Sequence, residues 1–299
     1  MYDLMIIGSG PAGISAALTA KARNLNFIWF GSRALSTKIE KAEKIMNYPG
    51  LPAVTGSEMQ SVFLKQIDDC GITITESQVN SIYDCGGYFA AGADNEIYEA
   101  KAVIMTVGMT TTREIEGEAR LLGCGVSYCA TCDGAFFKNK TVAVVGGGDV
   151  ALEDALYLSN ICEKVYLVHR RDELRGAKIL QSRIFETKNI EFKPSYEISE
   201  IYGEDTVTGA KLLNNKTGEE EELSLSAVFI AVGMEPQSEL IKGIVDTDKT
   251  GYIIATEDCR TSMDKVYAVG DIRTKSLRQV VTAVADGAVA ITSIEQDTK

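Results

Sequence analysis

The sequence predicts an α/β protein of two domains, the second inserted into the first. An apolar run at 4–7 leads into a glycine-rich turn and a helix-like stretch, and the same order recurs from residue 142. Two further apolar runs, 102–109 and 227–234, both end in Val-Gly-Met, as the late strands of two related units would. A last apolar run, 265–271, has no place in the second unit, so we assign it to the first sheet.

This strand order implies a discontinuous first domain. We expect residues 1–112 and 240–299 to form that domain and residues 113–239 to form the inserted one. The candidate crossing segments, 108–117 and 233–243, are rich in polar and turn-forming residues, which is typical of connections between domains.

A glycine-rich loop follows the first strand of each unit. Glycine permits a tight turn at these places, and the helix N-terminus that follows attracts a pyrophosphate. Strand, loop, helix and second strand in this order predict two Rossmann-like dinucleotide-binding domains, the second inserted into the first. The loop residues are Gly8, Ser9, Gly10, Pro11, Ala12 and Gly13 in the first domain and Gly146, Gly148, Asp149 and Ala151 in the second.

The second strands end differently in the two units, which indicates two different nucleotides. The strand at 26–30 runs into Gly31 and supplies no acid for a ribose hydroxyl. The strand at 164–168 runs into a histidine and then a basic segment, with His169, Arg170, Arg171 and Arg175.

The guanidinium groups of this basic segment match the oxygens of a 2′-phosphate, which favours NADP over NAD in the second domain. The first domain is then left for a flavin. The alternative is that the arginines only pair with two acids at a helix start, Asp172 and Glu173.

Cys129 and Cys132 form a Cys-x-x-Cys pair that is followed at once by Asp133. A zinc site would need further ligands, but no second such pair occurs and the only histidine lies beside the second glycine loop, so no metal is expected. Closely spaced thiols close a disulfide readily and can have a lowered pKa, which favours a redox pair. Asp133 is then the candidate proton donor, and the alternative for it is a helix N-cap or a turn residue.

Composition makes several classes of protein improbable. Thirty basic and 42 acidic residues give a net charge of −12, and no stretch combines lysine or arginine with aromatic residues, so nucleic acid is not an expected partner. No apolar run approaches the roughly 18 residues that span a bilayer, and we find no secretion signal. Seven cysteines favour a reducing cytoplasm, and an acidic run at 217–223 is expected at a hairpin tip.

Three motifs, CATCDG, HRRDELR and VYAVGD, together with the two nucleotide units, resemble the low-molecular-weight thioredoxin reductases over essentially the whole chain. The resemblance implies that FAD binds the first domain and NADPH the second. It implies that Cys132 faces the flavin and that Cys129 attacks the disulfide of thioredoxin, with Asp133 as proton donor. Such enzymes rotate the inserted domain between the two steps and are typically homodimers.

The same resemblance implies further cofactor contacts. Around FAD it adds Lys38, Asn47, Gly270, Asp271, Arg278 and Gln279, and around NADPH it adds His169, Arg170, Arg171 and Arg175. Two segments depart from the family pattern. Ser36-Thr37-Lys38 stands where Gly-Gly-Gln or Gly-Gly-Lys is usual, and Thr106-Val107-Gly108 stands where Ala-Thr-Gly is common.

Two other functions stay open at the level of the sequence. A branch of related enzymes takes its electrons from ferredoxin and lacks the nicotinamide motifs, whereas this chain keeps them. The second alternative is of a different class: a redox sensor whose flavin and thiols respond to the redox state of the cell without catalytic turnover.

Overall fold

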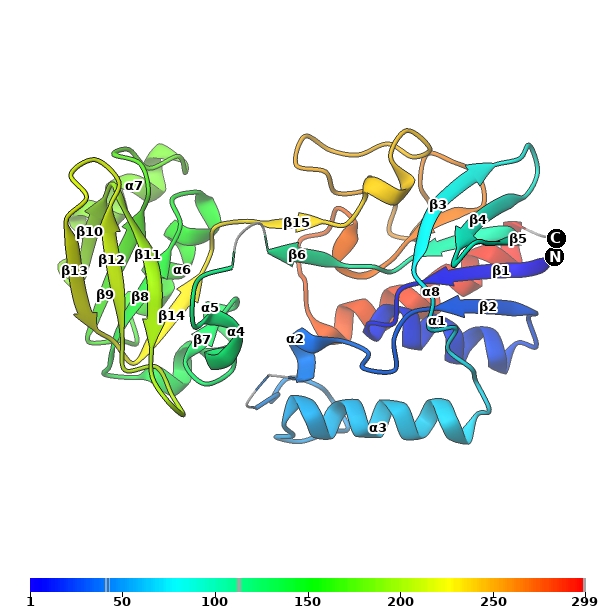
Figure 1. The fold of residues 1–299 in the computed structure, drawn as a ribbon, viewed down its shortest axis with the longest axis horizontal. Helices are drawn as coiled ribbons and strands as arrows, with labels where there is room; N and C mark the ends of the chain where they lie inside the picture. Colours follow the sequence, from blue (N-terminus) through cyan, green and yellow to red (C-terminus); the bar gives the residue numbers. More distant parts are fainter. Residues whose placement is uncertain (41, 43, 112–113, 298–299) are drawn as a thin grey trace. The chain divides into compact units, whose positions relative to one another are not determined.

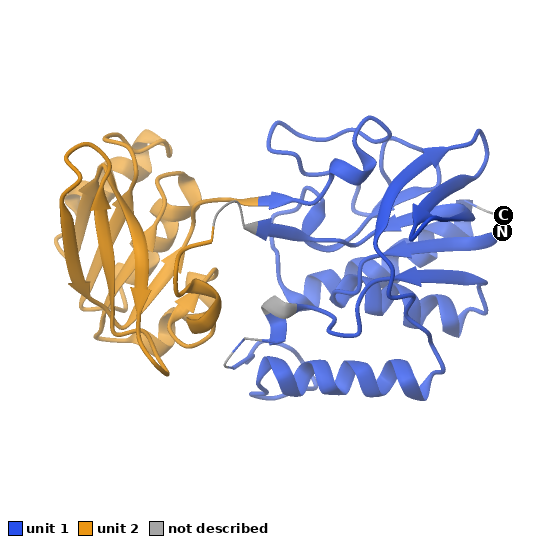
Figure 2. Cartoon of the chain, viewed as in Figure 1, with its two compact units in different colours: residues 1–110, 235–299 blue, residues 111–234 orange. Residues whose placement is uncertain are grey.

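The structure, a computed structural model, describes residues 1–40, 42, 44–111 and 114–297, without the side chains of Thr37, Lys38 and Thr111. The chain divides into two compact units (Figure 2). Unit 1 comprises Met1–Thr110 and Glu235–Lys299, and unit 2 comprises Thr111–Met234.

Unit 1 is built on a six-stranded sheet in the order β2-β1-β5-β4-β3, with β16 paired to β5 (Figure 1). The strands are β1 Tyr2–Ile7, β2 Phe27–Phe30, β3 Val79–Asp84, β4 Phe89–Ala93, β5 Glu96–Met105 and β16 Val266–Ala268. β1 runs parallel to β2 and β5, and β16 runs parallel to β5 with Val266 opposite Val103. The apolar run near the end of the chain therefore returns to the first sheet, as predicted.

The strands of unit 1 separate two cores. Leu4 and Ile6 of β1 pack in the core that contains the helices, whereas Met5 and Ile7 pack on the other face with β3 and β4. Because both faces are covered, β1 reads as an unbroken apolar run rather than an alternating one. The helices are α1 Pro11–Ala22, α2 Thr37–Glu40, α3 Gly56–Asp69 and α8 Val280–Asp297.

Unit 2 repeats this plan with a five-stranded parallel sheet in the order β10-β9-β8-β14-β7. The strands are β7 Val126–Ser127, β8 Thr141–Val145, β9 Lys164–His169, β10 Ile190–Pro194 and β14 Ala227–Ile230. One core contains the helices α6 Asp149–Ser159 and α7 Lys178–Glu186, and the other contains an antiparallel meander. The meander strands are β11 Tyr196–Tyr202, β12 Gly209–Asn214 and β13 Glu220–Ser224.

The acidic run lies in this meander, and its predicted place at a hairpin tip is mostly wrong. Turn residues 215–217 form the tip, while Glu220–Ser224 form β13, which pairs with β12. Among the described strands β13 pairs with β12 alone, so it is an edge strand, where the charge of its glutamates discourages pairing with another chain.

The two crossings between the units pair with each other. β6 Met109–Thr111 and β15 Met234–Pro236 form a two-stranded sheet (Figure 1), and the Gln237 amide donates to the Gly108 carbonyl at 3.1 Å. The chain changes units after Thr110 and after Met234, whereas the sequence placed the changes after residues 112 and 239. Within the described ranges, no helix is both long enough and apolar enough to cross a membrane.

Candidate functional site

The first glycine loop connects β1 to α1 in unit 1. Gly8 has φ +115°, and a Cβ there would lie 2.7 Å from the main chain of Thr106. A Cβ on Gly13 would lie 2.1 Å from the Gly8 carbonyl oxygen, so this glycine lets the helix pack against the loop. Gly10 has no heavy atom within 4 Å of its Cβ position, which leaves open space beside the N-terminus of α1. This is a cradle into which a pyrophosphate fits.

Ser9 and Pro11 have structural reasons to be in this loop. Pro11 is the first residue of α1, where its missing N–H costs no hydrogen bond. The Ser9 hydroxyl is buried, accepts from the Ser32 amide at 2.9 Å and lies 3.4 Å from the Leu35 carbonyl. Ser9 therefore ties the glycine loop to the turn after β2, where the sequence shows no carboxylate.

The short 3₁₀ helix η3, Gly270–Ile272, lies beside this loop although it is far away in the sequence. A Cβ on Gly270 would be 3.1 Å from the Cβ of Ala12 in the first turn of α1. Asp271 is the middle residue of η3. The structure therefore brings Asp271 close to the first glycine loop, as a shared cofactor site requires.

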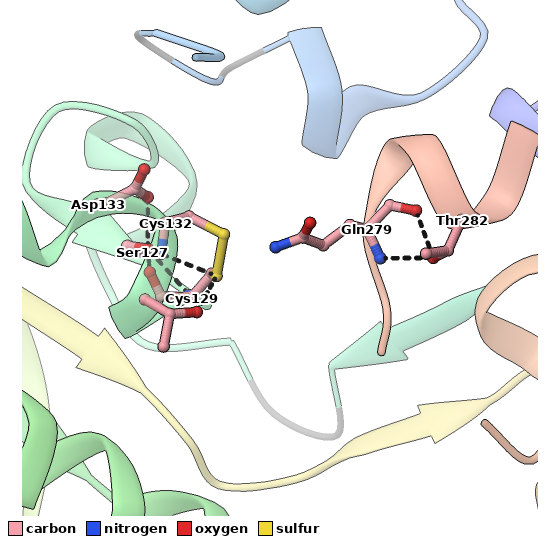
Figure 3. The surroundings of a disulfide bond; sticks show 7 residues. Ser127, Cys129, Cys132, Asp133, Gln279 and Thr282 are labelled. Atoms are coloured by element: carbon pink, nitrogen blue, oxygen red, sulfur yellow. Dashed lines mark hydrogen bonds between the residues drawn. A yellow bond between two sulfur atoms is a disulfide. The ribbon is translucent and has the colours of Figure 1, made fainter. Parts of the chain in front are cut away.

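Arg278 and Gln279 follow η3 and precede α8. The Arg278 guanidinium lies 4.1 Å from the centre of the Tyr252 ring and donates to the carbonyl oxygens of Asp271 and Arg273 at 3.4 and 3.3 Å. The main-chain N–H of Gln279 donates to the Thr282 hydroxyl at 3.1 Å, next to the start of α8 (Figure 3). Arg278 is thus held against η3.

Two other residues that the resemblance assigns to FAD are less informative. Asn47 is exposed in a bend, and the side chain of Lys38 lies outside the described residues. The segment that differs from the family pattern, Ser36-Thr37-Lys38, is nevertheless hydrogen-bonded to α3. The buried side-chain amide of Gln60 accepts from the Ser36 N–H at 3.3 Å and donates to the Ser36 carbonyl at 2.9 Å.

The second glycine loop, between β8 and α6 in unit 2, repeats this geometry. A Cβ on Gly146 would meet the Ala231 carbonyl at 2.4 Å, while Gly148 has no heavy atom within 4 Å of its Cβ position. Ala151 takes the place of the third glycine and is fully buried. Asp149 begins α6, and its carboxylate accepts from the Ala177 amide at 2.6 Å. The open space again lies at a helix N-terminus.

His169 ends β9 with its ring against this loop. A Cβ on Gly147 would lie 2.5–2.6 Å from three atoms of the His169 ring. The imidazole is buried, and within the described residues its Nε2 has no hydrogen-bond partner. Burial first, and then the charges of the three nearby arginines, lower the pKa of His169 below its usual value, so the ring is neutral at pH 7. The His169 ring therefore packs against Gly147 of the second glycine loop.

The three arginines are exposed around His169, and in the described part of the chain none is ion-paired. Asp172 instead binds Lys216 and the Ser195 hydroxyl, so the alternative in which it pairs with these arginines is wrong. The Gly147 carbonyl accepts from the main-chain amides of Arg175 and Gly176 at 2.6 and 3.1 Å. The basic segment is therefore fastened to the glycine loop and presents unpaired cations, which suits a phosphate.

Cys129 and Cys132 are joined by a disulfide, with a Cα–Cα distance of 5.3 Å (Figure 3). The pair spans the first turn of the short helix α5, Ala130–Asp133, which follows β7. The Cys132 amide lies 3.2 Å from the Cys129 sulfur and donates to it. Cys132 is exposed and Cys129 is half-buried, so the disulfide is accessible from solvent within unit 2.

Asp133 is oriented by Ser127, a residue that the sequence did not single out. The Ser127 hydroxyl donates to Oδ2 of Asp133 at 2.6 Å and accepts from the Cys129 amide at 3.0 Å (Figure 3). Cys129 is the N-cap of α5, and Asp133 is the N-cap residue of the 3₁₀ helix that follows, η1 Gly134–Phe137, without a side-chain cap hydrogen bond. Asp133 therefore occupies the N-cap position that the alternative gave it, while the Ser127 hydroxyl holds its carboxylate next to the redox pair.

The other cysteines are all free thiols, namely Cys70, Cys85, Cys124, Cys162 and Cys259. Burial raises the pKa of Cys162 to about 11, which keeps it an unreactive thiol. Among the described residues, no cluster of three or more His, Cys, Asp or Glu is placed to hold a metal ion.

A solvent-accessible disulfide that shares its unit with one nucleotide loop, in a chain with a second such loop, defines a nucleotide-dependent disulfide oxidoreductase. Residues 2–287 match the family model described as pyridine nucleotide-disulphide oxidoreductase, and the chain belongs to that family. Members are oxidoreductases that use FAD and NADPH, and this chain is one of them.

Individual relatives agree with this assignment. The chain is 38% identical to a thioredoxin reductase from Bacillus subtilis over 99% of its own length and 94% of the relative's. The structure of thioredoxin reductase from Streptococcus pyogenes superposes with a TM-score of 0.91 at 39% identity and covers 100% of this chain and 98% of that one. A ferredoxin-flavin thioredoxin reductase from Clostridium acetobutylicum gives a TM-score of 0.55 at 36% identity and covers 100% and 99%.

Proposed function

We propose that the protein is an NADPH-dependent thioredoxin reductase, in which electrons pass from NADPH through FAD and the Cys129–Cys132 disulfide to thioredoxin. The single observation that carries the proposal is the accessible disulfide in the unit that also holds the basic nucleotide segment. Similarity to thioredoxin reductases over nearly the whole chain supports thioredoxin, or a thioredoxin-like small disulfide protein, as the electron acceptor.

The two cofactors would bind to different units. In this proposal residues 8–13, with Asn47, Gly270, Asp271, Arg278 and Gln279, hold FAD in unit 1. Residues 146–151 and the three arginines hold NADPH in unit 2, while His169 supports this loop by packing against Gly147. The supporting features are the open positions at Gly10 and Gly148 and the unpaired arginines.

Bound FAD supplies two-electron transfer between a nicotinamide and a disulfide. Reduction of the Cys129–Cys132 bond to two thiols takes two electrons and two protons, and the sulfur that leaves as a thiolate must receive its proton from a nearby acid. Asp133, fixed by the Ser127 hydroxyl, is the proposed donor of that proton. Cys129 then attacks the thioredoxin disulfide as a thiolate, and the thiolate of Cys132 resolves the mixed disulfide that results. The two protons that these thiols lose pass to the two sulfurs of thioredoxin, and the Cys129–Cys132 disulfide forms again.

The disulfide and the nicotinamide loop both belong to unit 2, whereas the flavin loop belongs to unit 1. One flavin can serve both partners in turn if unit 2 rotates about the paired crossings β6 and β15. We further propose that unit 2 rotates in this way, that the protein is a homodimer and that it is cytoplasmic. Five free thiols beside a single disulfide are consistent with a reducing compartment.

Anaerobic reduction of the holoprotein tests this function. Addition of NADPH is expected to bleach the flavin absorbance. Excess NADPH with a catalytic amount of thioredoxin and a reporter disulfide should then give steady NADPH consumption. A flavin that NADPH leaves oxidised, but that reduced ferredoxin bleaches, would contradict NADPH as the donor. Bleaching without turnover would instead favour the redox sensor.

Replacing Arg170 and Arg171 with alanine is expected to raise the KM for NADPH by about 10- to 100-fold and to leave the KM for NADH nearly unchanged. The reason is that two charge-assisted hydrogen bonds to the 2′-phosphate are lost, and NADH lacks that phosphate. Steady-state kinetics with both coenzymes measures the effect. Replacement of the nearby exposed Lys178 by alanine serves as the charge control, and equal losses with both coenzymes would contradict the role of the arginines.

A further inference from the structure

Asp286, in the interior of α8, belongs to a buried charge cluster that neither the sequence motifs nor the proposed mechanism uses. The carboxylate accepts from Arg273 Nε at 3.0 Å, Arg273 Nη2 at 3.1 Å and Lys275 Nζ at 2.8 Å. The side chains of all three residues are at most 10% exposed. A polar group buried to this extent is retained only where it is hydrogen-bonded.

The same carboxylate also binds the main chain of η3. The Gly270 amide donates to Oδ2 of Asp286 at 2.9 Å. Gly270 has φ +74°, a conformation that is strained for other residues, and it packs on Ala12 of α1. Asp286 therefore ties α8 to the residue of η3 that packs on the first turn of α1.

Arg273 connects this cluster to the loop that contains Thr256. Its Nη1 donates to the Thr256 carbonyl at 3.2 Å, and the Lys275 ammonium reaches the Thr282 carbonyl at 3.3 Å. Burial by itself would raise the pKa of Asp286, but the hydrogen bonds from Arg273, Lys275 and the Gly270 amide lower it below its usual value. The carboxylate is thus charged and bound by three partners from one segment, residues 270–275.

We propose that Asp286 is a positioning residue for FAD, which holds Gly270 and with it Asp271 against the first glycine loop. This inference rests on the proposed function, because it assumes that residues 8–13 and Asp271 bind FAD. Groups that orient cofactor-binding residues affect affinity by about 10- to 100-fold when they are changed, although they do not touch the cofactor.

The test compares FAD binding to the apoprotein in matched variants by quenching of FAD fluorescence, with urea unfolding of the same apoproteins. Asp286→Asn keeps the shape of the side chain and removes its charge, and it is expected to raise the Kd for FAD by about 10- to 100-fold. Asp286→Glu keeps the charge and displaces the oxygens from the Gly270 amide. It should raise the Kd with a smaller loss of stability, and it keeps the proposal testable if the asparagine variant does not fold.

Asp297→Asn is the matched control, since Asp297 is also a carboxylate of α8 that binds an arginine. It accepts from Arg260 Nε at 3.0 Å and from the Tyr267 hydroxyl at 2.6 Å, at the other end of the helix. This variant should lose stability and keep its affinity for FAD. A folded Asp286→Glu protein with the affinity of the unaltered chain would overturn the inference, as would equal losses of affinity in the Asp286 and Asp297 variants. Failure of the unaltered chain to bind FAD would contradict the proposed function instead.

Discussion

Serine in place of Cys129 or of Cys132 is expected to lower disulfide reduction by at least about a thousandfold and to leave FAD bound. Each variant lacks one sulfur of the only disulfide in the described chain, so electrons have no route from flavin to thioredoxin. FAD should stay because the glycine loop that we assign to it belongs to unit 1, whereas both cysteines belong to unit 2. Turnover with thioredoxin and flavin absorbance after gel filtration measure the two effects.

The two serine variants should also differ from each other. Cys129 accepts a hydrogen bond from the Cys132 amide, which would stabilise a thiolate at this position. In Cys132→Ser, Cys129 can still attack thioredoxin, and a stable mixed disulfide should accumulate on non-reducing gels. Cys129→Ser should give none. Cys124→Ser, a half-buried free thiol in the same unit, is the control and should keep activity; loss of FAD in the Cys129 or Cys132 variant would mean that the pair is structural.

Alanine at Gly10 is expected to weaken FAD binding without a loss of stability, whereas alanine at Gly13 is expected to lower the stability of the protein. At Gly10 the new methyl group meets no protein atom within 4 Å and the backbone has φ −68°, so stability should change by less than about 0.5 kcal/mol. The methyl group would, however, occupy the space left for the pyrophosphate. We expect the Kd for FAD to rise by about 10- to 100-fold.

At Gly13 the methyl group would lie 2.1 Å from the Gly8 carbonyl, so α1 must move away from β1. Overpacking of this kind costs about 1–3 kcal/mol, which exceeds the gain in helix propensity of roughly 1 kcal/mol. Urea unfolding of the apoproteins separates the two variants. A Gly10→Ala protein that binds FAD normally would contradict the assignment of this loop to the cofactor.

The sequence predicts the fold well because its signals are local. An apolar run, a glycine spacing and a helix start lie within about 20 residues of each other in both units, and each determines a strand, a loop and a helix. The distant strand at 265–271 could be assigned because no place was left for it in the second unit. The meander was not foreseen, since four consecutive glutamates, Glu219–Glu222, look like a loop unless the edge strand that carries them is known.

The polar supports of the site were harder to predict. Ser127 lies only two residues before Cys129, but nothing in its position says that its hydroxyl binds Asp133. Gly270 lies in η3 and Arg273 is its C-cap, whereas Asp286 lies 16 and 13 residues further along in α8, so Asp286 meets them only after η3 and α8 have packed. Such contacts depend on tertiary packing, for which spacing in the sequence gives no signal.

The attachment of the basic segment to the second glycine loop has a consequence for protein engineering. The contacts from Arg175 and Gly176 to Gly147 involve only main-chain atoms, and the Asp149 carboxylate binds the main chain of Ala177. The exposed guanidinium groups can therefore be exchanged for acidic or neutral side chains while the loop keeps its shape. If the arginines bind the 2′-phosphate as proposed, coenzyme preference in this chain is accordingly open to redesign, or to evolutionary drift, by a few surface substitutions.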